Sequence, residues 1–513
     1  MVATATLAAF ALIPTGAAYA APSSQNCESR NNNTIEKLLH CVDADGAMEH
    51  LEALQAIADA NGGNRAAGLP GYDASVDYVV ETLEAAGWNV TVEEFAFTFV
   101  GASTLEQLTP VNATYPTGPF TGSGPGDVTA AVTPVDVQLT TPNTNTSGCE
   151  DADFAGFPVG TIALIQRGTC TFAEKALNAE EAGAAGVIIF NAGDDETAAR
   201  QDLIVGTLGG SNIVGIPVVG ASYQQGVALA QAGSTAHVMV PEPEERPQQN
   251  VIAELPGNNT DNVVMAGAHL DSVQAGPGIN DNGSGSASLL EIAESLSKLK
   301  PENTLRFAWW GAEEAGLLGS AAYVESLTQE ERDRIALYLN FDMVASPNYI
   351  FMIYDGDESG FPAPVAVPEG SVAIEDLFES YFTSVGQPYD DAEFSGRSDY
   401  EAFILNGIPA GGLFTGAEVV KTEEQQAIWG GIAGESYDQC YHQACDTIDN
   451  INTEALDVNI DAIALAVLVY SYSTESVNGV VGKNIPGGLS LPAPAGPEGT
   501  VGSDGGHFHG LEG

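Results

Sequence analysis

Basic residues are scarce in this sequence. Its 513 residues include 15 Lys and Arg against 69 Asp and Glu, which gives a formal net charge of −54. A nucleic acid partner is excluded, because a polyanion must be neutralised by clustered Lys and Arg and no basic patch exists. The acidic excess predicts a solvated surface that keeps the protein soluble. A negative field that attracts free peptide α-amines would be a secondary effect, since salt screens it beyond roughly 10 Å.

Long apolar runs are also few. Residues 1–20 are apolar and end in Ala18-Tyr19-Ala20, the small-x-small pattern that signal peptidase accepts. This segment is too short for a membrane span and has no charged flank, and no other stretch reaches the roughly 20 apolar residues that a span requires. We therefore predict a signal peptide, a secreted protein and no membrane association.

Cysteine is limited to six residues, an even number that suits an oxidising compartment. Six cysteines allow fifteen connectivities, and sequence alone does not choose among them. Proximity along the chain favours three local pairs: Cys27 with Cys41, Cys149 with Cys170, and Cys440 with Cys445.

The length predicts two to four units, because about 150 residues is a typical domain size. A hydrophobic content of 44% with 58 Gly and 27 Pro indicates a globular α/β protein with many loops. Helical spacing predicts helices at Met48 to Ala60 and Ala74 to Ala86, and alternation predicts a strand at Asn89 to Val100. We divide the chain into a signal peptide (1–20), an N-terminal extension (21–45), the first part of a main domain (46–125), an insert (126–245), the second part of the main domain (246–475) and a tail (476–513).

The predicted insert has short alternating strands around one compact unit. In that unit a strand at Thr161 to Gln166 is followed by a helix at Phe172 to Ala182 and a strand at Val187 to Phe190, and another apolar run covers Ile213 to Val219. The unit has no metal-ligand cluster, which favours a binding or lid module. Its motifs Arg167-Gly168-x-Cys170-x-Phe172 and Ala182-Gly183-Ala184 resemble the protease-associated domain, a small β-rich insert of several secreted and vacuolar peptidases.

Residues 246–475 alternate between strand and helix. The runs NVVMAGAHL, TLRFAWWGA, IALYLNFDM and IPAGGLFT are almost continuously apolar, as expected for a mostly parallel sheet that is covered on both faces. Ser286 to Leu299 and Leu318 to Leu327 have helical spacing. The fold class that follows is α/β, with a mixed, mostly parallel central sheet, helices on both faces and an inserted β-rich domain. The Gly- and Pro-rich tail, with His507 and His509, is predicted to be disordered and inert.

Acidic residues and one histidine follow the predicted strands. They are His269, Asp271, Asp281, Glu313, Glu314 and Asp342. Taken singly, an acid after a strand is usually a helix cap or a solvated loop residue. Parallel strands, however, present their carboxyl ends at one edge of the sheet, where ligands bind. Carboxylates gathered there would repel one another unless cations occupied the site. The pattern therefore predicts a metal.

Histidine narrows the choice of metal. The chain has seven histidines, and within 246–475 only His269 and His442 occur. Two histidines and several carboxylates form a mixed nitrogen and oxygen ligand set that zinc accepts. Asp281, presented from a Gly-rich loop, could bridge two ions. Spacing alone leaves a mononuclear zinc site or a magnesium site open.

Five ordered segments resemble the co-catalytic zinc aminopeptidases, a family of secreted bacterial and yeast vacuolar enzymes. They are GAHLDSVQAGPGINDNGSGSASLLEIA (267–293), WWGAEEAGLLGS (309–320), LNFDMVASPN (339–348), GRSDYEAFILNGIPAGGLFTGAE (396–418) and CYHQACDTIDNIN (440–452). The similarity extends through NGGNRAAGLPGYDASVDYV (61–79) and covers nearly all of 46–475 once the insert is set aside. It implies the zinc exopeptidase fold for the main domain.

The resemblance implies a role for each candidate residue. His269 and Asp342 would bind one zinc, Glu314 and His442 the other, and Asp281 would bridge the two. Asp271 would orient His269 through its other ring nitrogen, as such ligands usually require. Glu313 matches the general base, and Tyr441 the phenol that stabilises the oxyanion.

The same family binds the free α-amine of its substrate at a closed end of the site. The counterparts of that subsite are Glu313, Asp342 and the backbone carbonyl of Arg397, which would allow exopeptidase action on peptides with a free N-terminus. Phe414 resembles part of the side-chain pocket, which suggests Leu, Met or Phe as the first residue; a core role for Phe414 is the alternative. The pair Cys440 and Cys445 would hold the loop that carries Tyr441 and His442.

A calcium site is a further expectation. Asp457 and Asp461 are four residues apart, where like charges on one helix face repel, and calcium would relieve the repulsion as it does in some family members. Other functions remain open: a glutaminyl cyclase with one zinc, a carboxypeptidase of related fold, or a metal-free receptor-like relative. We expect a monomeric secreted enzyme with two zinc ions.

Overall fold

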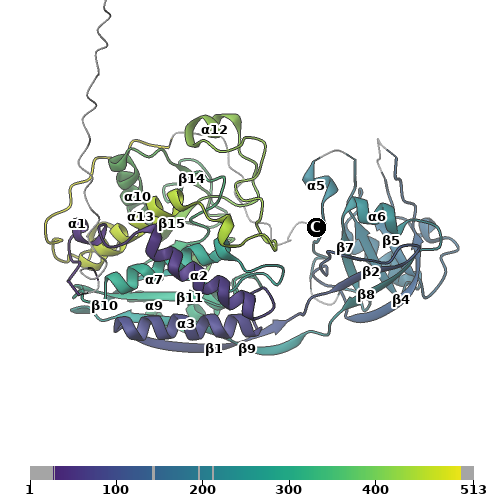
Figure 1. The fold of residues 1–513 in the computed structure, drawn as a ribbon, viewed down its shortest axis with the longest axis horizontal. Coiled ribbons are helices and arrows are strands. Elements are labelled where there is room, and N and C mark those ends of the chain that lie inside the picture. Colours follow the sequence, from purple (N-terminus) through teal and green to yellow (C-terminus); the bar gives the residue numbers. More distant parts are fainter. Residues whose placement is uncertain (1–26, 28, 141–144, 195–196, 211–212, 498–513) are drawn as a thin grey trace, which may run out of the picture.

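The computed structural model describes residue 27 and residues 29–140, 145–194, 197–210 and 213–497. The chain forms a main body and an insert, each built on its own sheet (Figure 1). The predicted signal peptide lies outside the described residues. The predicted α/β fold with an inserted domain is confirmed.

The main body contains an eight-stranded mixed sheet. Its four central strands, β11, β10, β12 and β15, are parallel, and antiparallel strands β1 and β9 extend one side. In spatial order the strands are β1 (Asn89–Phe99), β9 (Glu244–Leu255), β11 (Asn303–Trp310), β10 (Asn259–His269), β12 (Ile335–Phe341), β15 (Ala410–Phe414), β13 (Met352–Tyr354) and β14 (Asp390–Ala392).

Helices cover both faces of this sheet, which explains why its strands are apolar throughout. Alternate residues of β10 enter different cores: Val264 and Ala266 pack with α2, α3, α7 and α13, whereas Val263 and Met265 pack with α8 and α11. The helices of the main body are α1 (Ile35–Leu38), α2 (Ala44–Ala60), α3 (Pro70–Ala86), α7 (Gly285–Ser295), α8 (Leu318–Ser326), α9 (Gln329–Asp333), α10 (Ser371–Val385), α11 (Tyr400–Leu405), α12 (Glu423–Trp429), α13 (Thr453–Tyr472) and α14 (Glu475–Asn478). One turn of π-helix (Ile279–Ser284) precedes α7, and a short 3-10 turn (Ile448–Asn450) precedes α13.

Helix α13 is long and apolar enough to be compared with a membrane span. By length and composition it could cross a membrane, although no further span was predicted. In the structure most of this helix is buried in the core of the main body, against β10, β11 and α10. It is therefore a core helix.

The insert is a seven-stranded sheet with its own two apolar cores. In spatial order its strands are β3 (Ala113–Tyr115), β2 (Thr104–Thr109), β8 (Thr235–Val240), β4 (Gly126–Pro134), β5 (Ile162–Gln166), β6 (Gly186–Phe190) and β7 (Val218–Ala221). Its helical segments are a 3-10 turn (Asp151–Phe154), α4 (Phe172–Glu181), α5 (Ala198–Gln201) and α6 (Tyr223–Leu229). The predicted run Ile213 to Val219 is a strand only from Val218.

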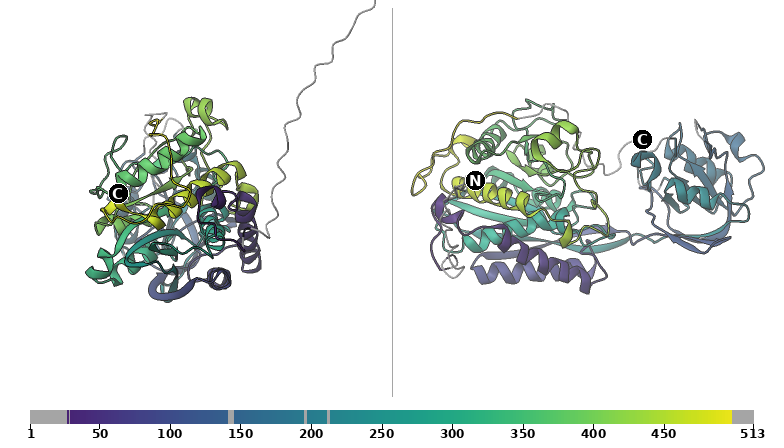
Figure 2. Two further views of the ribbon diagram at one scale, coloured as in Figure 1. Left: turned by 90° about the vertical axis from the view of Figure 1, so that its left-hand side faces the viewer. Right: turned by 45° about the horizontal axis from the view of Figure 1, so that its top comes forward.

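The insert begins earlier in the chain than the predicted boundary at 126. Strands β2 and β3 lie within 46–125, yet β2 pairs with β8 of the insert. The long antiparallel pair β1 and β9 carries the chain from the main body to the insert and back, with Phe99 opposite Glu244 at its far end. Figure 1 and the right-hand view of Figure 2 show the two bodies joined in this way.

All three predicted disulfides are present: Cys27–Cys41, Cys149–Cys170 and Cys440–Cys445. The first fastens the N-terminal extension, the second lies in the insert, and the third closes a loop of the main body. The local pairing chosen from proximity is confirmed.

The tail was predicted to be disordered, but its residues 476–497 have a defined structure. Ile485 is buried, and the backbone N–H groups of Ala495 and Gly496 donate to Thr383 Oγ1 and Tyr389 Oη, at 3.0 and 2.8 Å. These residues therefore pack on the main body. Residues 498–513, including His507 and His509, lie outside the described residues.

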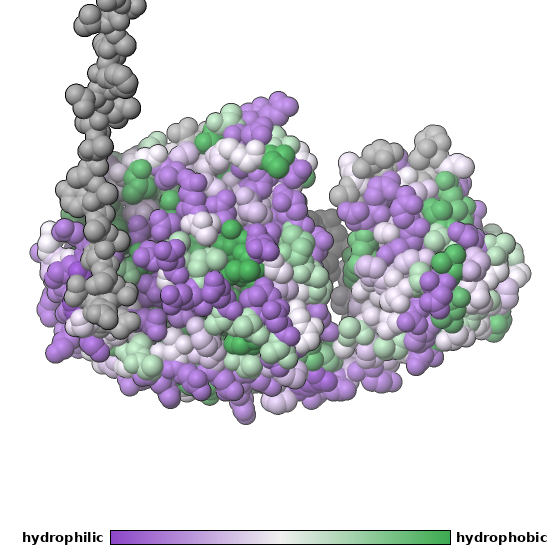
Figure 3. Space-filling view, viewed as in Figure 1, coloured by the Kyte–Doolittle hydropathy of each residue, from purple (hydrophilic) through white to green (hydrophobic). Residues whose placement is uncertain are grey.

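The face of the molecule in Figure 3 is mostly hydrophilic, with apolar residues in small scattered groups. This agrees with the solvated surface that the acidic excess predicts.

Candidate metal centre

Four of the candidate residues occupy the carboxyl ends of neighbouring parallel strands. His269 is the last residue of β10, Glu313 and Glu314 follow β11, and Asp342 directly follows β12. Since β10 pairs in parallel with both β11 and β12, these ends meet at one edge of the sheet. The sheet topology therefore brings together residues that lie up to 73 positions apart.

Two further candidates reach this edge from loops. Asp281 lies in the π-helical turn before α7, and His442 lies in the loop closed by Cys440–Cys445. His442 has a backbone φ of 55°, in the left-handed region that non-glycine residues rarely adopt. Ala312 and Met343, beside Glu313 and Asp342, share this feature. Such strained backbone tends to gather at functional sites.

The first group of donor atoms surrounds His269. Its Nε2 lies 3.3 Å from both Asp281 Oδ1 and Asp342 Oδ1, and 3.9 Å from Glu313 Oε2. His269, Glu313 and Asp342 each offer one donor atom, and these atoms all lie within 4.8 Å of one another. All four side chains are buried.

The second group surrounds His442. Its Nε2 lies 3.0 Å from Glu314 Oε2 and 3.2 Å from Asp281 Oδ2. The donor atoms of Asp281, Glu314 and His442 also lie within 4.8 Å of one another. Asp281 thus points one carboxylate oxygen at His269 and the other at His442. The adjacent glutamates separate, with Glu313 in the His269 group and Glu314 in the His442 group.

The donor atoms fit a cation because buried oxygens among them lack other partners. Among the described residues, Asp342 Oδ1 and both carboxylate oxygens of Glu314 are buried and accept no hydrogen bond. Burial, with the charge of Asp281 as a further cause, raises the pKa of Glu314 to about 7. Burial and the charge of Asp342 also raise the pKa of Glu313 well above its ordinary range. A divalent cation in each group would satisfy these oxygens and offset the repulsion.

Asp271 has two sets of contacts at the site. The ring Nδ1 of His269 lies 3.1 Å from the backbone oxygen of Asp271 and 3.7 Å from its carboxylate. The carboxylate also accepts hydrogen bonds from the backbone N–H groups of Glu313 and Glu314, at 3.1 and 3.3 Å. Asp271 therefore fixes the backbone that presents both glutamates.

Asp446 holds the bridging candidate in the same manner, a role that the sequence analysis missed. Its carboxylate accepts from the backbone N–H groups of Asn280 at 2.8 Å and Asp281 at 3.0 Å. Asn450 donates to both Asp446 and Asp438, and Asp438 also accepts from the side chain of Asn280. The sequence signal for this role was the position of Asp446 in segment 440–452, one of the five segments that resemble the zinc aminopeptidases.

Arg65 is the second residue that was missed. Its side chain is fully buried and donates to the backbone oxygens of Leu270, Pro277 and Gly278. These carbonyls belong to the loop between His269 and Asp281, so one guanidinium group shapes the connection between two candidate ligands. The signal in the sequence was the scarcity of basic residues. With only 15 in the chain, an arginine in a segment that resembles the family was a candidate for a specific contact.

Asp399 is a third buried acid beside the centre. Neither of its carboxylate oxygens has a hydrogen-bond partner within the described residues, and burial raises its pKa to about 7. The neighbouring Ser398 donates to Asp342 Oδ2 at 2.6 Å. The GRSD segment thus supports the Asp342 side of the centre.

The predicted substrate residues come from three segments. Tyr441 is in the His442 loop, Arg397 precedes α11, and Phe414 ends β15. The ring of Tyr441 stacks on that of His442, with centroids 3.8 Å apart, and burial raises the pKa of Tyr441. Arg397 Nη2 lies 3.5 Å from Glu418 Oε1. Phe414, the last residue of β15, is buried in the core that also contains Met343.

The two predicted calcium ligands lie on α13, away from the metal centre. Asp457 Oδ1 accepts from the backbone N–H of Ala44 at 3.1 Å. Burial, then the charges of Asp457 and Asp43, raise the pKa of Asp461 to about 7. Among the described residues, these aspartates form no group of three donors within 4.8 Å.

Comparison with known proteins decides the family. The family model "Peptidase family M28" matches residues 250–467, and the model "PA domain" matches residues 128–229. An aminopeptidase of Pseudomonas aeruginosa is 52% identical over 450 residues, which cover 86% of this chain and 83% of the relative. The chain belongs to peptidase family M28. The probable lipoprotein aminopeptidase LpqL of Mycobacterium tuberculosis is 43% identical over 457 residues, 86% of this chain and 87% of the relative.

Solved structures of aminopeptidases agree with this assignment. The aminopeptidase from Aneurinibacillus sp. strain AM-1 has a TM-score of 0.59 and 30% identity, and covers 88% of this chain and 97% of its own. The zinc aminopeptidase BSAP from Bacillus subtilis has a TM-score of 0.64 and 28% identity, and covers 83% and 94%. This M28 protein is an aminopeptidase with an inserted protease-associated domain, as the sequence resemblance implied.

A cleft of about 680 Å³ opens from one side of the M28 metal centre. Glu314 and His442 line its inner end, and residues 97–103, which lead from β1 into the insert, line one wall. Residues 117–119 and Val205 of the insert line its far part. Glu313, Asp342, Arg397 and Phe414 do not line it, so the cleft leaves the centre on the side of the His442 group.

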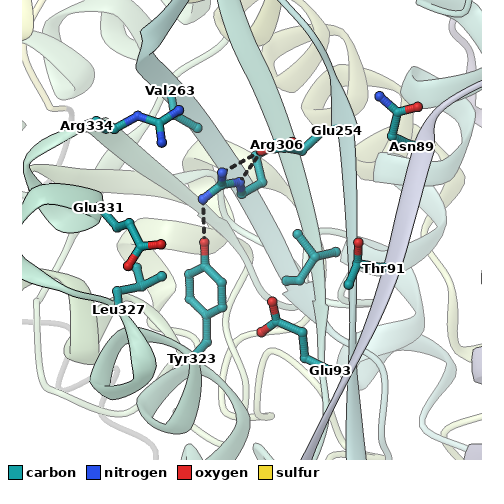
Figure 4. A pocket seen from close by; sticks show the side chains of 11 residues that line it. Asn89, Thr91, Glu93, Glu254, Val263, Arg306, Tyr323, Leu327, Glu331 and Arg334 are labelled. Atoms are coloured by element: carbon teal, nitrogen blue, oxygen red, sulfur yellow. Dashed lines mark hydrogen bonds and ion pairs between the residues drawn. The ribbon is translucent and has the colours of Figure 1, made fainter.

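A second cavity, of about 260 Å³, lies on the outer face of the sheet beside β1 and β9 (Figure 4). At its centre Arg306 donates to Glu254 Oε1 and Tyr323 Oη. The cavity shares no lining residue with the metal centre. The guanidinium group of Arg306 is already paired with Glu254 and Tyr323.

Proposed function

We propose that this chain is a secreted two-zinc aminopeptidase that removes an apolar first residue from peptides, with Glu313 as general base. The observation that carries the proposal is the position of Asp281. Its Oδ1 lies 3.3 Å from His269 and its Oδ2 lies 3.2 Å from His442, so one carboxylate belongs to both donor groups. A shared carboxylate is what a pair of metal ions requires.

In this proposal His269 and Asp342 would hold one zinc, Glu314 and His442 would hold the other, and Asp281 would be shared by both. The nitrogen and oxygen donors suit zinc, and BSAP, a relative of the same fold, is a zinc aminopeptidase. When bound, the two ions polarise the scissile carbonyl and lower the pKa of a water molecule.

Glu313 is placed to move the proton. Its carboxylate is buried beside the donors, and burial raises its pKa well above the ordinary range, which makes it a stronger base than an exposed glutamate. It takes a proton from the attacking water and returns it to the departing nitrogen. Asp271 keeps Glu313 in position through the backbone hydrogen bond described above.

The substrate's α-amine would bind between the carboxylates of Glu313 and Asp342 and the backbone carbonyl of Arg397. These groups favour an ammonium and leave no path for a longer chain, which supports exopeptidase action. Phe414 provides an apolar wall for the first side chain, and we expect Leu, Met or Phe there. Tyr441 would stabilise the oxyanion from its place against His442.

Secretion is supported by the apolar segment 1–20 and by the three disulfides, which form in oxidising compartments. We retain calcium at Asp457 and Asp461 as a proposal, since the charges of Asp457 and Asp43 raise the pKa of the buried Asp461. We expect the enzyme to act as a monomer.

The deciding experiment compares leucyl substrates with a free and an N-acetylated amine, before chelation, after chelation and after zinc return. We expect cleavage of the free form only, loss on chelation, recovery with zinc, and two zinc ions per chain by elemental analysis. One zinc per chain with cyclisation of glutaminyl peptides would favour a cyclase. Cleavage of the blocked substrate, or activity that resists chelation, would contradict the proposal.

A further inference from the structure

The proposed reaction does not explain the cleft between the metal centre and the insert. Glu314 and His442 line it, whereas Glu313, Asp342 and Arg397, the groups proposed for the α-amine, do not. A peptide whose first residue binds among Glu313, Asp342 and Arg397 must therefore continue into this cleft.

The walls of the cleft suit an apolar chain. Phe97 and Phe99, at the end of β1, pack edge to face with centroids 6.2 Å apart, and Arg246 lies 3.7 Å from the centre of the Phe99 ring. Opposite them, the insert contributes Pro119 and Val205. Val205 is 46% exposed, so its side chain is accessible to a ligand in the cleft.

Polar residues of both bodies also line the cleft. Ser103 Oγ is buried, and within the described residues it has no hydrogen-bond partner. Gln274 donates to the backbone oxygen of Val100 at 2.9 Å, which ties the loop after His269 to the segment that enters the insert. The cleft is thus built jointly by the main body and the insert.

We propose that this cleft binds the substrate residues that follow the scissile bond, and that Val205 of the insert recognises an apolar side chain among them. This inference rests on the proposed aminopeptidase function and extends it to the substrate class: peptides with an apolar residue downstream of the first. The insert then contributes to specificity and takes no part in the chemistry.

The test measures kcat/KM for leucinamide, which ends at the scissile bond, and for Leu-Gly-Gly-Gly peptides in which Phe replaces each glycine in turn. In the wild type, at least one Phe position should raise kcat/KM about tenfold, because a phenyl ring is partly buried. Val205→Asp should remove that gain and leave leucinamide hydrolysis unchanged, whereas Val205→Ile should keep it. Val159→Asp is the matched control, since Val159 is in the insert, 80% exposed, and does not line the cleft.

Two results would overturn the inference: equal kcat/KM for the glycine and phenylalanine peptides, or equal effects of Val205→Asp and Val159→Asp. In both cases the wild type would still release leucine from leucinamide. A failure of the proposed function would differ, because the zinc-loaded wild type would then leave leucinamide intact.

Discussion

The carboxylate of Asp446 accepts a hydrogen bond from the backbone N–H of Asp281, with an N···O distance of 3.0 Å, and a second one from Asn280. Asp271 binds the N–H groups of Glu313 and Glu314 in the same way. Two buried acids beside the donor groups thus fix the backbone of Asp281, Glu313 and Glu314. Such supporting groups usually affect metal affinity as strongly as activity.

Asp446→Asn should weaken zinc binding and lower kcat about 10- to 100-fold, because the amide replaces one acceptor with a donor that faces a backbone N–H. Calorimetric zinc titration and leucyl substrate kinetics would measure both effects. Asp449→Asn, an exposed change in the same loop, should alter neither. Wild-type zinc affinity in Asp446→Asn would show that the backbone of Asp281 keeps its position without this contact.

Glu313→Gln should keep both zinc ions and lower kcat by about 10²- to 10⁴-fold, the range attributed to general base catalysis. The amide is nearly the same size as the carboxyl group but cannot accept the proton. Elemental analysis and kinetics on one preparation would separate metal loss from loss of proton transfer. The exposed Glu325→Gln serves as control. Retained turnover would rule out the proposed role.

Arg65→Met should destabilise the fold by about 3–5 kcal/mol, because removing a buried cation leaves polar partners without compensation. Three backbone oxygens, those of Leu270, Pro277 and Gly278, would lose their donors. Urea unfolding would measure the change, with the exposed Lys298→Met as control. An unchanged unfolding midpoint would mean that water replaces the guanidinium group.

Glu375→Gln should stabilise the protein at pH 8 and have little effect at pH 5. Burial, then the charges of Asp357 and Asp355, raise the pKa of Glu375 from 4.5 to about 9. The folded state therefore holds a proton that the unfolded chain releases, and the free energy of unfolding falls as pH rises between these two values. The gain at pH 8 should be at least about 1 kcal/mol.

Thermal unfolding across this pH range, with the exposed Glu369→Gln as control, would test the sign. Destabilisation by Glu375→Gln at pH 8 would show that the carboxylate is ionised and paired in the folded protein.

The parts of the fold and of the site that could be predicted are those whose sequence pattern lies within a short stretch of the chain. His269, Asp342 and the two glutamates follow apolar strands directly, so their place at the sheet edge could be predicted from the strands themselves. For helix α13 the sequence indicated only that Asp457 and Asp461 share a helix face, because the helix is apolar on nearly all sides and has no amphipathic period that would show its extent. Strands β2 and β3 precede the predicted boundary at 126, because β8, the strand that pairs with β2, lies more than 100 residues later, and β3 pairs with β2.

The sequence by itself indicated the family and the candidate ligands through motifs of specific residue types, and proximity along the chain favoured the three disulfide pairs that the structure contains. Only the tertiary structure decided which groups hold those candidates in place. Arg65 lies more than 200 residues from the carbonyls that it binds, and Asp446 lies 165 residues from Asp281. No local pattern encodes such contacts, since they exist only once the sheet has brought the segments together. The cleft beside Val205 likewise requires both bodies to be folded.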